Sequence, residues 1–391
     1  SKMSCFMKIP KITMGLVILM ACLMVESKVS AADGVLDSFM GAPELDVQQI
    51  FQGQRFPNIT VAMDGSVLAS WGSKGVQVRR SVDGGKSWSS PVVVQKSGFQ
   101  GGGITVDEKT GDVLMFIEDS HPPAPISIYR SKDHGQTWAK QETVMHPNSL
   151  GHVPSMHMND HGSTLQFGKH AGRLIRPSRW YAAGNRHEEW PNHYTNAIYS
   201  DDRGKTWYAS EPFPEQGTGE ACIVELSDGT LYYNSRVHWE KAERNTRRRC
   251  AFSRDGGKTW EDWRIVDILP DGHQHRSYGC MGGLARLPVK GRDILVFSNL
   301  DTPKANRERI TVWMSPDGGQ TWPVKRLVYD GASAYSSMSA GRSDTPSEGS
   351  VYLMFEGGPG GGAQIGRFNL AWVLQGELTG DGEIPDWLKV E

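Results

Sequence analysis

Side chains capable of acid–base chemistry gather in the segment FIEDSHPPAP, residues 116–125. The segment places Glu118, Asp119 and His121 where an expected strand runs into a loop stiffened by prolines, and such loops often carry function. A carboxyl group whose pKa is raised by burial would serve there as a general acid, and a histidine would need little tuning to do the same. An ordinary polar loop fits the same residues, so the segment alone leaves both interpretations open.

A carboxylate and a guanidinium are spaced to meet in the segment TGEACIVELSDGTLYYNSR, residues 218–236. Between Glu220 and Arg236 lie one expected strand, an SDG turn and a second strand, so both side chains reach the same end of one hairpin. Solvated charges at a hairpin end are the alternative interpretation.

The hairpins that must position such side chains share a sequence motif. An octapeptide with the pattern Ser-x-Asp-x-Gly-x-Thr/Ser-Trp occurs five times in the chain. In each copy Asp-x-Gly is typical of a hairpin turn, a strand-like run precedes it, and the Trp can pack over the turn. The octapeptide holds no nucleophile with its base, and five equal copies would mean five equal active sites, so we interpret it as structural. The copies are residues 81–88, 131–138, 200–207, 253–260 and 315–322.

The spacing of the copies predicts the architecture. They begin roughly 50 to 70 residues apart, which is the length of one four-stranded sheet with its loops, the unit of a propeller blade. The 391 residues include 45 Gly, 21 Pro and 13 Trp, a composition that favours a turn-rich all-β protein. We find no linker or shift in composition and therefore predict one domain over residues 32–391.

The charge balance excludes two classes of partner. A formal net charge of -2 and a pI of about 6.6 give no electrostatic footprint for nucleic acid or for an anionic membrane. An anionic substrate would have to be recognised by local arginines. The histidine spacings fit no standard metal motif, so we expect neither a metal nor another cofactor.

The N-terminus reads as a secretory signal. Lys8 and Lys11 precede the apolar run ITMGLVILMACLMV, and small residues up to Ala31 form a cleavage pattern. We therefore expect a signal peptide over residues 1–31, a secreted or periplasmic protein, and no membrane span in the mature chain. A lipoprotein site at Cys22 is the alternative.

Three cysteines remain beyond that segment: Cys222, Cys250 and Cys280. An odd number at wide spacing forms neither a disulfide framework nor a zinc site. We expect buried small hydrophobic side chains, with one bridge and one free thiol as the alternative.

The octapeptide resembles the Asp-box of the sialidase (neuraminidase) superfamily, also known as the BNR repeat, and the resemblance extends over about residues 45–375. It implies a six-bladed β-propeller with five Asp-boxes, in which strands from both ends of the chain close one blade. The segment IGRFNLAWVL, residues 365–374, is the expected closing strand.

The resemblance also implies a site for an acidic sugar. Three arginines would hold its carboxylate: Arg55 in QRFPN, Arg236, and Arg307 in NRERITVWMS, where Arg309 has the same parity and is the alternative. Tyr335 in GASAYSSM would be the nucleophile, and Glu220 would take its proton. Glu356 in YLMFEGG would orient Arg55, while Arg173 reads as scaffold.

One family feature is missing. Sialidases usually carry an Asp general acid/base between the first arginine and the first Asp-box, but here the loop is shortened to WGSKG, and Asp64 reads as a hairpin tip. We therefore expect the acid from the segment 116–125, with Asp119 as first choice and His121 as second. The histidine-rich stretches 152–161 and 185–194 are candidates to line the pocket.

The resemblance thus implies an exo-acting, retaining glycoside hydrolase that releases a terminal sialic acid or a related keto-acid sugar from sialylated or other acidic-sugar glycans. The missing carboxylate supports a second hypothesis, a non-catalytic propeller that binds acidic carbohydrate. Linkage preference, hydrolysis versus transfer, and oligomeric state stay open.

Overall fold

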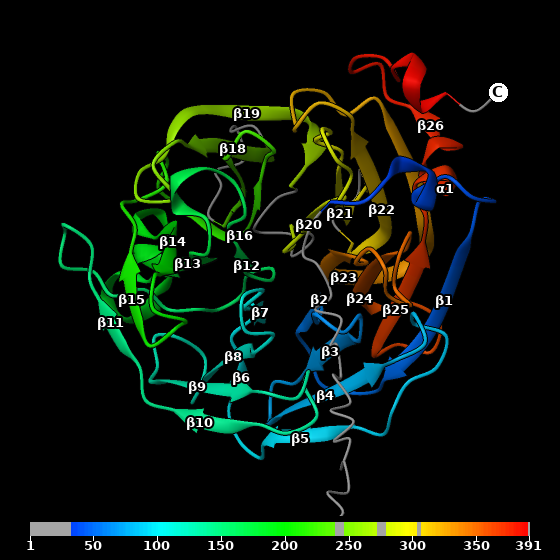
Figure 1. Ribbon diagram of the computed structural model, residues 1–391. Helices are drawn as coiled ribbons and strands as arrows, with labels where there is room; N and C mark the ends of the chain where they lie inside the picture. Colours follow the sequence, from blue (N-terminus) through cyan, green and yellow to red (C-terminus); the bar gives the residue numbers. More distant parts are fainter. Residues whose placement is uncertain (1–32, 239–245, 272–278, 303–305, 390–391) are drawn as a thin grey trace, which may run out of the picture.

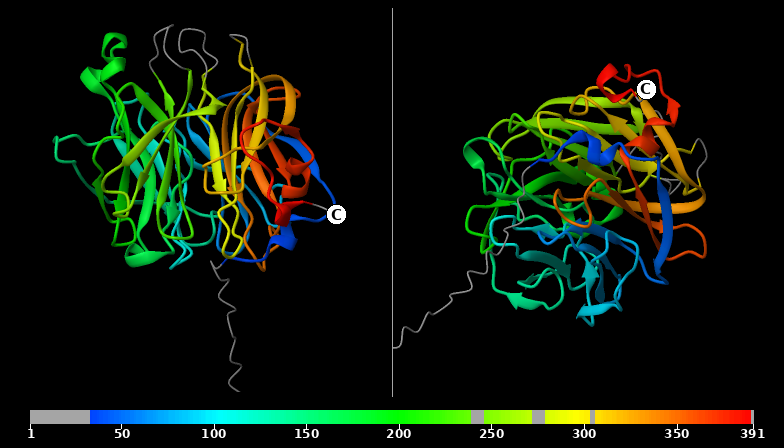
Figure 2. Two further views of the ribbon diagram at one scale, coloured as in Figure 1. Left: turned by 90° about the horizontal axis from the view of Figure 1, so that it is seen from above. Right: turned by 45° about the vertical axis from the view of Figure 1, so that its right-hand side comes forward.

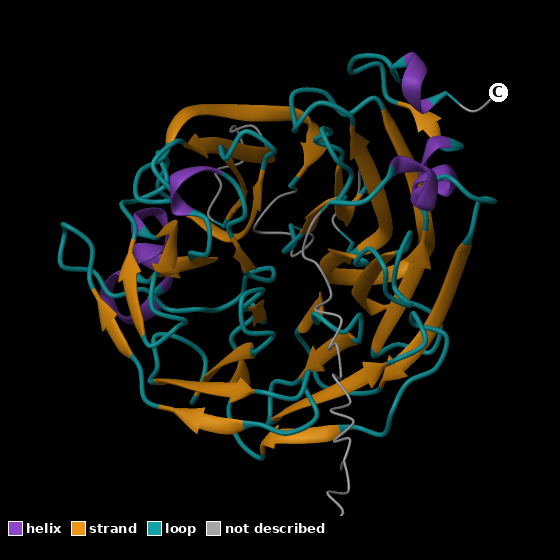
Figure 3. Ribbon diagram, in the orientation of Figure 1, coloured by secondary structure: helices purple, strands orange, loops and turns teal. Residues whose placement is uncertain are grey.

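The computed structural model describes residues 33–238, 246–271, 279–302 and 306–389, so the expected signal peptide lies outside the described residues. Strands that are mostly antiparallel stand around a central axis, and the sheets follow one another around the ring in chain order (Figure 1). The predicted all-β, propeller-like architecture is therefore confirmed. No helix in the described ranges is long and apolar enough to cross a membrane. The helical segments, at the periphery and in loops (Figure 3), are α1 (Leu370–Leu374) and the 3-10 turns Leu36–Phe39, Gly168–His170, Ala182–Asn185, His187–Asn192 and Asp386–Leu388.

Four sheets of four or five strands form separate blades. The first holds β2 (Pro57–Val61), β3 (Val67–Trp71), β4 (Val76–Ser81) and β5 (Val92–Gln95); the second β6 (Phe99–Gln100), β7 (Thr105–Val106), β8 (Val113–Glu118), β9 (Ile126–Ser131) and β10 (Ala139–Gln141); the third β11 (Val144–His146), β12 (Ser163–Thr164), β13 (Leu174–Trp180), β14 (Tyr194–Ser200) and β15 (Thr206–Ala209); the fourth β16 (Thr218–Glu225), β17 (Leu231–Val237), β18 (Arg247–Ser253) and β19 (Glu261–Pro270).

The fifth sheet is continuous and has eight strands. Its long strand β23 spans 17 residues and pairs with β22 through its first part and with β24 through its last part. Because β23 does not break between these two pairings, the hydrogen bonding does not divide the ring into the six separate blades expected from the sequence. The strands are β1 (Leu45–Phe51), β20 (Gly283–Arg286), β21 (Leu295–Leu300), β22 (Glu308–Ser315), β23 (Val324–Ala340), β24 (Val351–Gly357), β25 (Ala363–Phe368) and β26 (Glu377–Leu378).

Strands from both ends of the described chain close the ring. β1 pairs antiparallel with β25 from Leu45 opposite Phe368 to Phe51 opposite Ala363, and Figure 1 shows the two side by side. The closing strand expected over residues 365–374 is only half right, since α1 follows directly on β25. The Asn369 side chain explains the change, because its oxygen accepts the Trp372 N–H at 3.0 Å and caps the helix.

The five octapeptides adopt one common turn. In each copy the serine Oγ donates to the aspartate Oδ1 at 2.8–2.9 Å, and the glycine N–H two residues after the aspartate donates to the serine Oγ at 2.8–2.9 Å. In the copy at Asp255, the carboxylate also accepts the Thr259 N–H at 3.0 Å. Each aspartate is thus used within its own turn.

That same glycine joins each turn to the sheet before it. Gly257 has φ +90°, and a Cβ there would lie 2.2 Å from Cδ1 of Ile175 in β13, so only glycine fits. The corresponding glycines of the other copies face a side chain of the preceding sheet in the same way: Tyr352, Leu68, Leu114 and Tyr232. The octapeptides therefore hold neighbouring sheets together, in agreement with their interpretation as structural.

A belt of buried polar groups links the strands nearest the axis. Asn58 of β2 donates to the Asn159 carbonyl at 3.1 Å, and Asn159 accepts the Ala221 N–H of β16 at 3.0 Å. Asp160 accepts the Leu284 N–H of β20 at 2.9 Å and the Ser337 hydroxyl of β23 at 2.5 Å. Because the belt crosses between sheets, it fixes how the inner strands sit relative to one another.

The three cysteines are buried and form no disulfide with one another. Cys222 lies on β16 and Cys250 on β18, where both pack in the hydrophobic cluster between the fourth sheet and the eight-stranded sheet. This agrees with their expected role as small buried side chains.

Candidate active site

The predicted site residues come together at one end of the ring. Viewed from the side, the strands run roughly along the axis, so each has one end at either face (Figure 2). Six side chains from three sheets meet at the same face: Arg55 before β2, Glu220 on β16, Arg236 on β17, Arg307 before β22, Tyr335 on β23 and Glu356 on β24.

Tyr335 and Glu220 form a buried pair. The Tyr335 hydroxyl donates to Glu220 Oε1 at 2.5 Å, and Arg236 Nη1 contacts Glu220 Oε2 and donates to the Tyr335 oxygen at 3.2 Å. Exposed fractions are 6% for Tyr335, 1% for Glu220 and 3% for Arg236. The pair is thus shielded from bulk water and hydrogen-bonded in the sense needed to move a proton from the phenol to the carboxylate.

Opposite effects set the pKa values of the pair. Burial, followed by the charge of Glu220, raises the pKa of Tyr335 to about 12, although the three arginines act against it. Burial also acts to raise the pKa of Glu220, but Arg236, His238 and Arg179 outweigh it and lower that pKa to about 2. At neutral pH the site therefore holds a neutral phenol beside an ionised carboxylate.

Three guanidinium groups surround the tyrosine ring. The Cζ atoms of Arg55, Arg307 and Arg236 lie 4.8, 5.3 and 6.0 Å from its centroid, and a cavity of about 350 Å³ opens beside Arg55 and Arg307. Planar, permanently charged donors that converge in this way suit a carboxylate.

Glu356 ties the first arginine to the tyrosine. It accepts two hydrogen bonds from Arg55, from Nε and from Nη2, both at 2.8 Å. The same carboxylate accepts the Tyr335 N–H at 3.1 Å and the Phe56 N–H at 3.3 Å. A single side chain therefore orients Arg55 relative to Tyr335.

Arg309, the alternative third arginine, lies elsewhere. Its Nε donates to the Asp301 carbonyl at 3.1 Å and its Nη1 pairs with Asp330, away from Tyr335. The expectation that Arg307 and Arg309 face the same side is wrong because the β22–β23 register shifts between Glu308 and Ile310, and Arg309 has φ +64°. Arg173, expected as scaffold, bonds Asp201 through Nε and Nη2 at 2.8 and 2.9 Å.

The two acid candidates differ in their surroundings. Both side chains are exposed, and within the described ranges the Asp119 carboxylate forms no ion pair with an arginine. The His121 ring lies 5.0 Å from His157 and 5.6 Å from Phe99, centroid to centroid. Partial desolvation, with the nearby Arg179 charge, lowers the pKa of His121. Of the two, only His121 is in electrostatic contact with Glu220.

The shortened loop WGSKG is held beside Arg55. The side-chain oxygen of Gln54 accepts the N–H groups of Ser73 and Lys74, each at 3.0 Å. Asp64 accepts the Ser66 N–H at 2.9 Å within a tight turn, as expected for a hairpin tip. Neither the loop nor this turn brings a carboxylate to Tyr335.

A fourth arginine beside the pair escaped the sequence analysis. Arg179 on β13 acts electrostatically on Glu220, His121, His157 and His238. Its segment, LIRPSRW, carries no recognisable motif, and the only available signal was a charged residue inside an otherwise buried strand. The histidine-rich stretches contribute His157 and His193 to this region, whereas His152 stacks on Trp180 at 3.7 Å.

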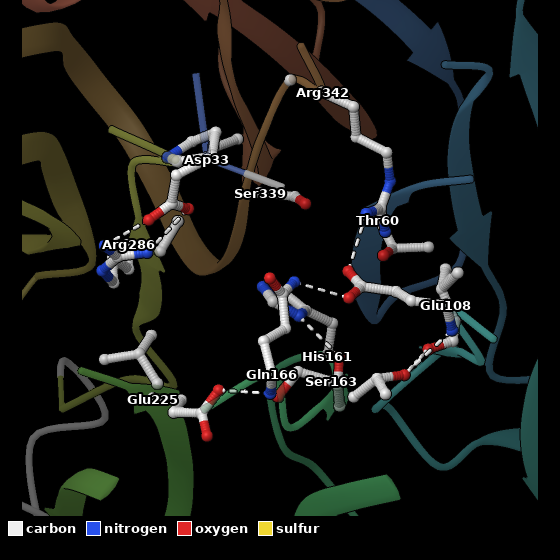
Figure 4. A pocket seen from close by; sticks show the side chains of 18 of the residues that line it. Asp33, Thr60, Glu108, His161, Ser163, Gln166, Glu225, Arg286, Ser339 and Arg342 are labelled. Atoms are coloured by element: carbon white, nitrogen blue, oxygen red, sulfur yellow. Dashed lines mark hydrogen bonds and ion pairs between the residues drawn. The ribbon is translucent and has the colours of Figure 1, made fainter. Parts of the chain in front are cut away.

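A second cavity, about 150 Å³ in volume, is lined by residues from several sheets (Figure 4). Its lining residues Thr60, Glu225 and Ser339 lie farther along β2, β16 and β23 than the candidate catalytic side chains of those strands. Among the described residues, no group of three or more potential metal ligands is present there or elsewhere. Both of its arginines are paired, Arg342 with Glu108 at 2.7 Å and Arg286 with Asp33 at 2.8 Å.

Comparison with known proteins places the chain in a family. The model of the BNR repeat-like domain matches residues 69–352. The sialidase of Micromonospora viridifaciens is 32% identical over 86% of this chain, and the match spans about half, 54%, of that protein. Among solved structures, the match to Hadza microbial sialidase Hz136 covers 82% of this chain and 66% of that chain, with a TM-score of 0.62 and 22% identity. The match to the intramolecular trans-sialidase of Ruminococcus gnavus covers 83% of this chain and 96% of that chain, with a TM-score of 0.64 and 16% identity. Most of the residues that form the ring thus carry the BNR repeat-like domain, and the chain belongs to the sialidase superfamily.

Proposed function

We propose that this protein is an exo-acting glycoside hydrolase of the sialidase type, which releases a terminal sialic acid or a related keto-acid sugar from sialylated or other acidic-sugar glycans. The observation that carries the proposal is the Tyr335 hydroxyl, hydrogen-bonded at 2.5 Å to an ionised Glu220 and surrounded by three guanidinium groups. Arg55, Arg236 and Arg307 hold the carboxylate of the sugar, and Glu356 orients Arg55.

The reaction follows from these positions in two steps. The Tyr335 oxygen attacks the anomeric carbon, its proton passes to Glu220 Oε1, and the bond to the glycosidic oxygen breaks. A neutral tyrosine suits this attack better than a carboxylate, because the anomeric carbon already bears an anionic group. Water then attacks the same carbon, its proton goes to the acid/base group, and Tyr335 leaves with the proton held by Glu220. Two displacements give retention of configuration.

The leaving oxygen needs a proton, and we assign the donor to His121 rather than to Asp119. The packing of the His121 ring against His157 and its electrostatic contact with Glu220 support this choice. Asp119, our first choice from the sequence, is exposed like His121 but has no comparable contact with the described site residues.

Hydrolysis of an aryl sialoside and of sialyllactose by purified protein tests the proposal, with the anomeric outcome followed by NMR. Tyr335→Phe removes the nucleophile and retains the ring, so we expect loss of hydrolysis with an unchanged unfolding midpoint. Absence of product from sialosides and from related ulosonic-acid glycosides, with Tyr335→Phe indistinguishable from wild type, would refute the proposal.

A second candidate is a non-catalytic propeller that binds acidic carbohydrate. The loop WGSKG, which carries no carboxylate beside Arg55, favours it. An aryl sialoside with a good leaving group separates the two functions, because such a substrate needs little acid assistance. Binding without turnover of that substrate would support the second candidate.

We also propose that the propeller has six blades, two of which share the strand β23. The division falls within β23, whose first part would belong with β20–β22 and whose last part would belong with β24, β25 and β1. Whether the product is a free sugar or a transferred one is decided by the same NMR experiment.

A further inference from the structure

Arg179 stands out among the buried arginines. Among the residues that the structure describes, four arginines are fully buried, and three of them have partners. Arg248 bonds Asp271 at 3.1 Å, Arg249 bonds Glu215 at 2.8 Å, and Arg176 donates to backbone carbonyls, the nearest of them that of Gly102 at 2.9 Å. In contrast, no described group accepts a hydrogen bond from Nε or Nη2 of Arg179, which is 1% exposed.

A buried guanidinium with two unbonded nitrogen atoms is costly, because those atoms lose their hydration and gain no acceptor in return. A hydrophobic residue of similar volume would be more stable in such a place. The Tyr181 ring lies 4.3 Å from the Arg179 Cζ and offers only its face. The described residues therefore leave Nε and Nη2 of Arg179 open to an acceptor from a bound ligand.

The backbone makes room for this side chain directly beside Glu220. A Cβ at Gly219 would lie 3.1 Å from Cζ and from Nη2 of Arg179, and 2.9 Å from Cβ of His238. The residue before the catalytic carboxylate must therefore be small for Arg179 to occupy its position. The guanidinium lies next to the nucleophile pair and is about as buried as Glu220.

Two more unpartnered polar atoms lie in the same region. The Nδ1 atoms of His157 and His238 are buried and have no hydrogen-bond partner among the described residues. Both rings are in electrostatic contact with Arg179. Burial, with the Arg179 charge, lowers both pKa values well below 6.5, so that each neutral ring offers one donor and one acceptor.

The carboxylate of one sugar does not account for all four arginines of the site. In the proposed function the sugar carboxylate takes up Arg55, Arg236 and Arg307, and Arg179 remains. We propose that Arg179, with His157 and His238, forms a second anion-binding position, so that the preferred substrate carries a second permanent anion. Its chemistry is that of a sulfate ester on the sugar or of the carboxylate of an adjoining acidic sugar, since both accept planar guanidinium donors.

This inference rests on the proposed function. A comparison of the affinities for singly and doubly anionic probes tests it separately. The three probes are an aryl sialoside, the same sialoside with one sulfate ester, and an α2,8-linked disialoside. Because hydrogen bonds to charged groups contribute about 1.5–3 kcal/mol, we expect wild type to bind one doubly anionic probe about 10- to 100-fold more tightly, measured by calorimetry on the Tyr335→Phe background. Whichever probe gains identifies the source of the anion.

Arg179→Gln should reduce that preference to less than about threefold, whereas Arg309→Gln, an arginine outside the site, should preserve it. Arg179→Gln should not lower the unfolding midpoint of the free protein, since it removes a buried charge without a partner. Equal binding of all three probes by wild type would overturn the inference, and so would a loss of stability in Arg179→Gln with an unchanged preference. Hydrolysis of the plain sialoside reports on the proposed function independently of either result.

Discussion

At Tyr335 one phenol is under opposite influences. Burial and Glu220 raise its pKa to about 12, while the same Glu220, kept ionised by Arg236, accepts its hydrogen bond. The tyrosine thus stays neutral until an electrophile arrives, and its base is already in place. The pKa of the proposed acid, His121, lies below the ordinary 6.5, so less of this histidine is protonated at neutral pH.

The low pKa of His121 predicts how activity depends on pH. Only protonated His121 donates a proton, so kcat/KM for sialyllactose should fall as pH rises through a pKa below 6.5. His121→Ala should slow sialyllactose hydrolysis by about 10²- to 10⁴-fold and affect an aryl sialoside far less. Asp119→Ala is the matched control and should retain both activities. Equal losses on both substrates in His121→Ala would contradict the assignment.

Glu118 predicts a pH dependence of stability. It is buried on β8, accepts the Met156 N–H at 2.9 Å, and burial raises its pKa from 4.5 to about 7. Between pH 4.5 and about 7, Glu118 is protonated in the folded protein but ionised in the unfolded chain. The contribution of Glu118 to stability therefore falls as pH rises.

Glu118→Gln should remove this dependence. Relative to the variant, wild type should lose about 3 kcal/mol of unfolding free energy between pH 4.5 and 7, at 1.36 kcal/mol per pKa unit. Urea unfolding of both proteins across that range measures the difference. Parallel curves for the two proteins would show that Glu118 titrates normally.

At the scale of elements, the octapeptide turns join one sheet to the next through a glycine with no room for a side chain. The best-defined contact is that of Gly257 with Ile175 of β13, and the same arrangement recurs around the ring. The turn aspartates bond within their own loops, so these elements hold sheets together and take no part in the proposed chemistry.

Gly257→Ala tests this joint against a matched control. Gly257 and Gly361 both have positive φ, +90° and +73°, but a Cβ at Gly361 meets nothing within 4 Å. Both substitutions carry the penalty of about 1–2 kcal/mol for a Cβ at positive φ, and only Gly257→Ala adds a clash with Ile175. Denaturant unfolding should therefore show Gly257→Ala to be less stable than Gly361→Ala by more than about 1 kcal/mol. Equal losses would show that the contact is not tight.

At the scale of the whole molecule, closure by β1 holds the ring together and supports the site. β1 pairs with β25, and its Ile50 and Phe51 pack with Trp71 and Met354 in one hydrophobic cluster. The polar belt from Asn58 to Ser337 then sets the inner strands in register, so that the six candidate site residues meet at one face.

A protein that begins at Gln52 lacks β1 and should have an open ring. It exposes the edge of β25 and loses the burial of Ile50 and Phe51, each contributing about 1.5–3 kcal/mol, so we expect a loss of more than about 3 kcal/mol. Calorimetry should show a lower and broader unfolding transition. An unchanged transition would mean that the other sheets are stable without closure.

The sequence by itself determined the all-β propeller and the structural nature of the octapeptide, because both depend on short local patterns. It pointed to Tyr335, Glu220, Arg236, Arg55 and Glu356 through short segments that resemble those of one family. The tertiary structure decided what depends on packing between distant strands. A bulge turned Arg309 away from Tyr335, a cap made residues 370–374 helical, and the unbroken β23 merged two expected blades. Arg179 and the surroundings of His121 also emerged only there, since a missing partner is a property of the folded interior and leaves no pattern in the chain.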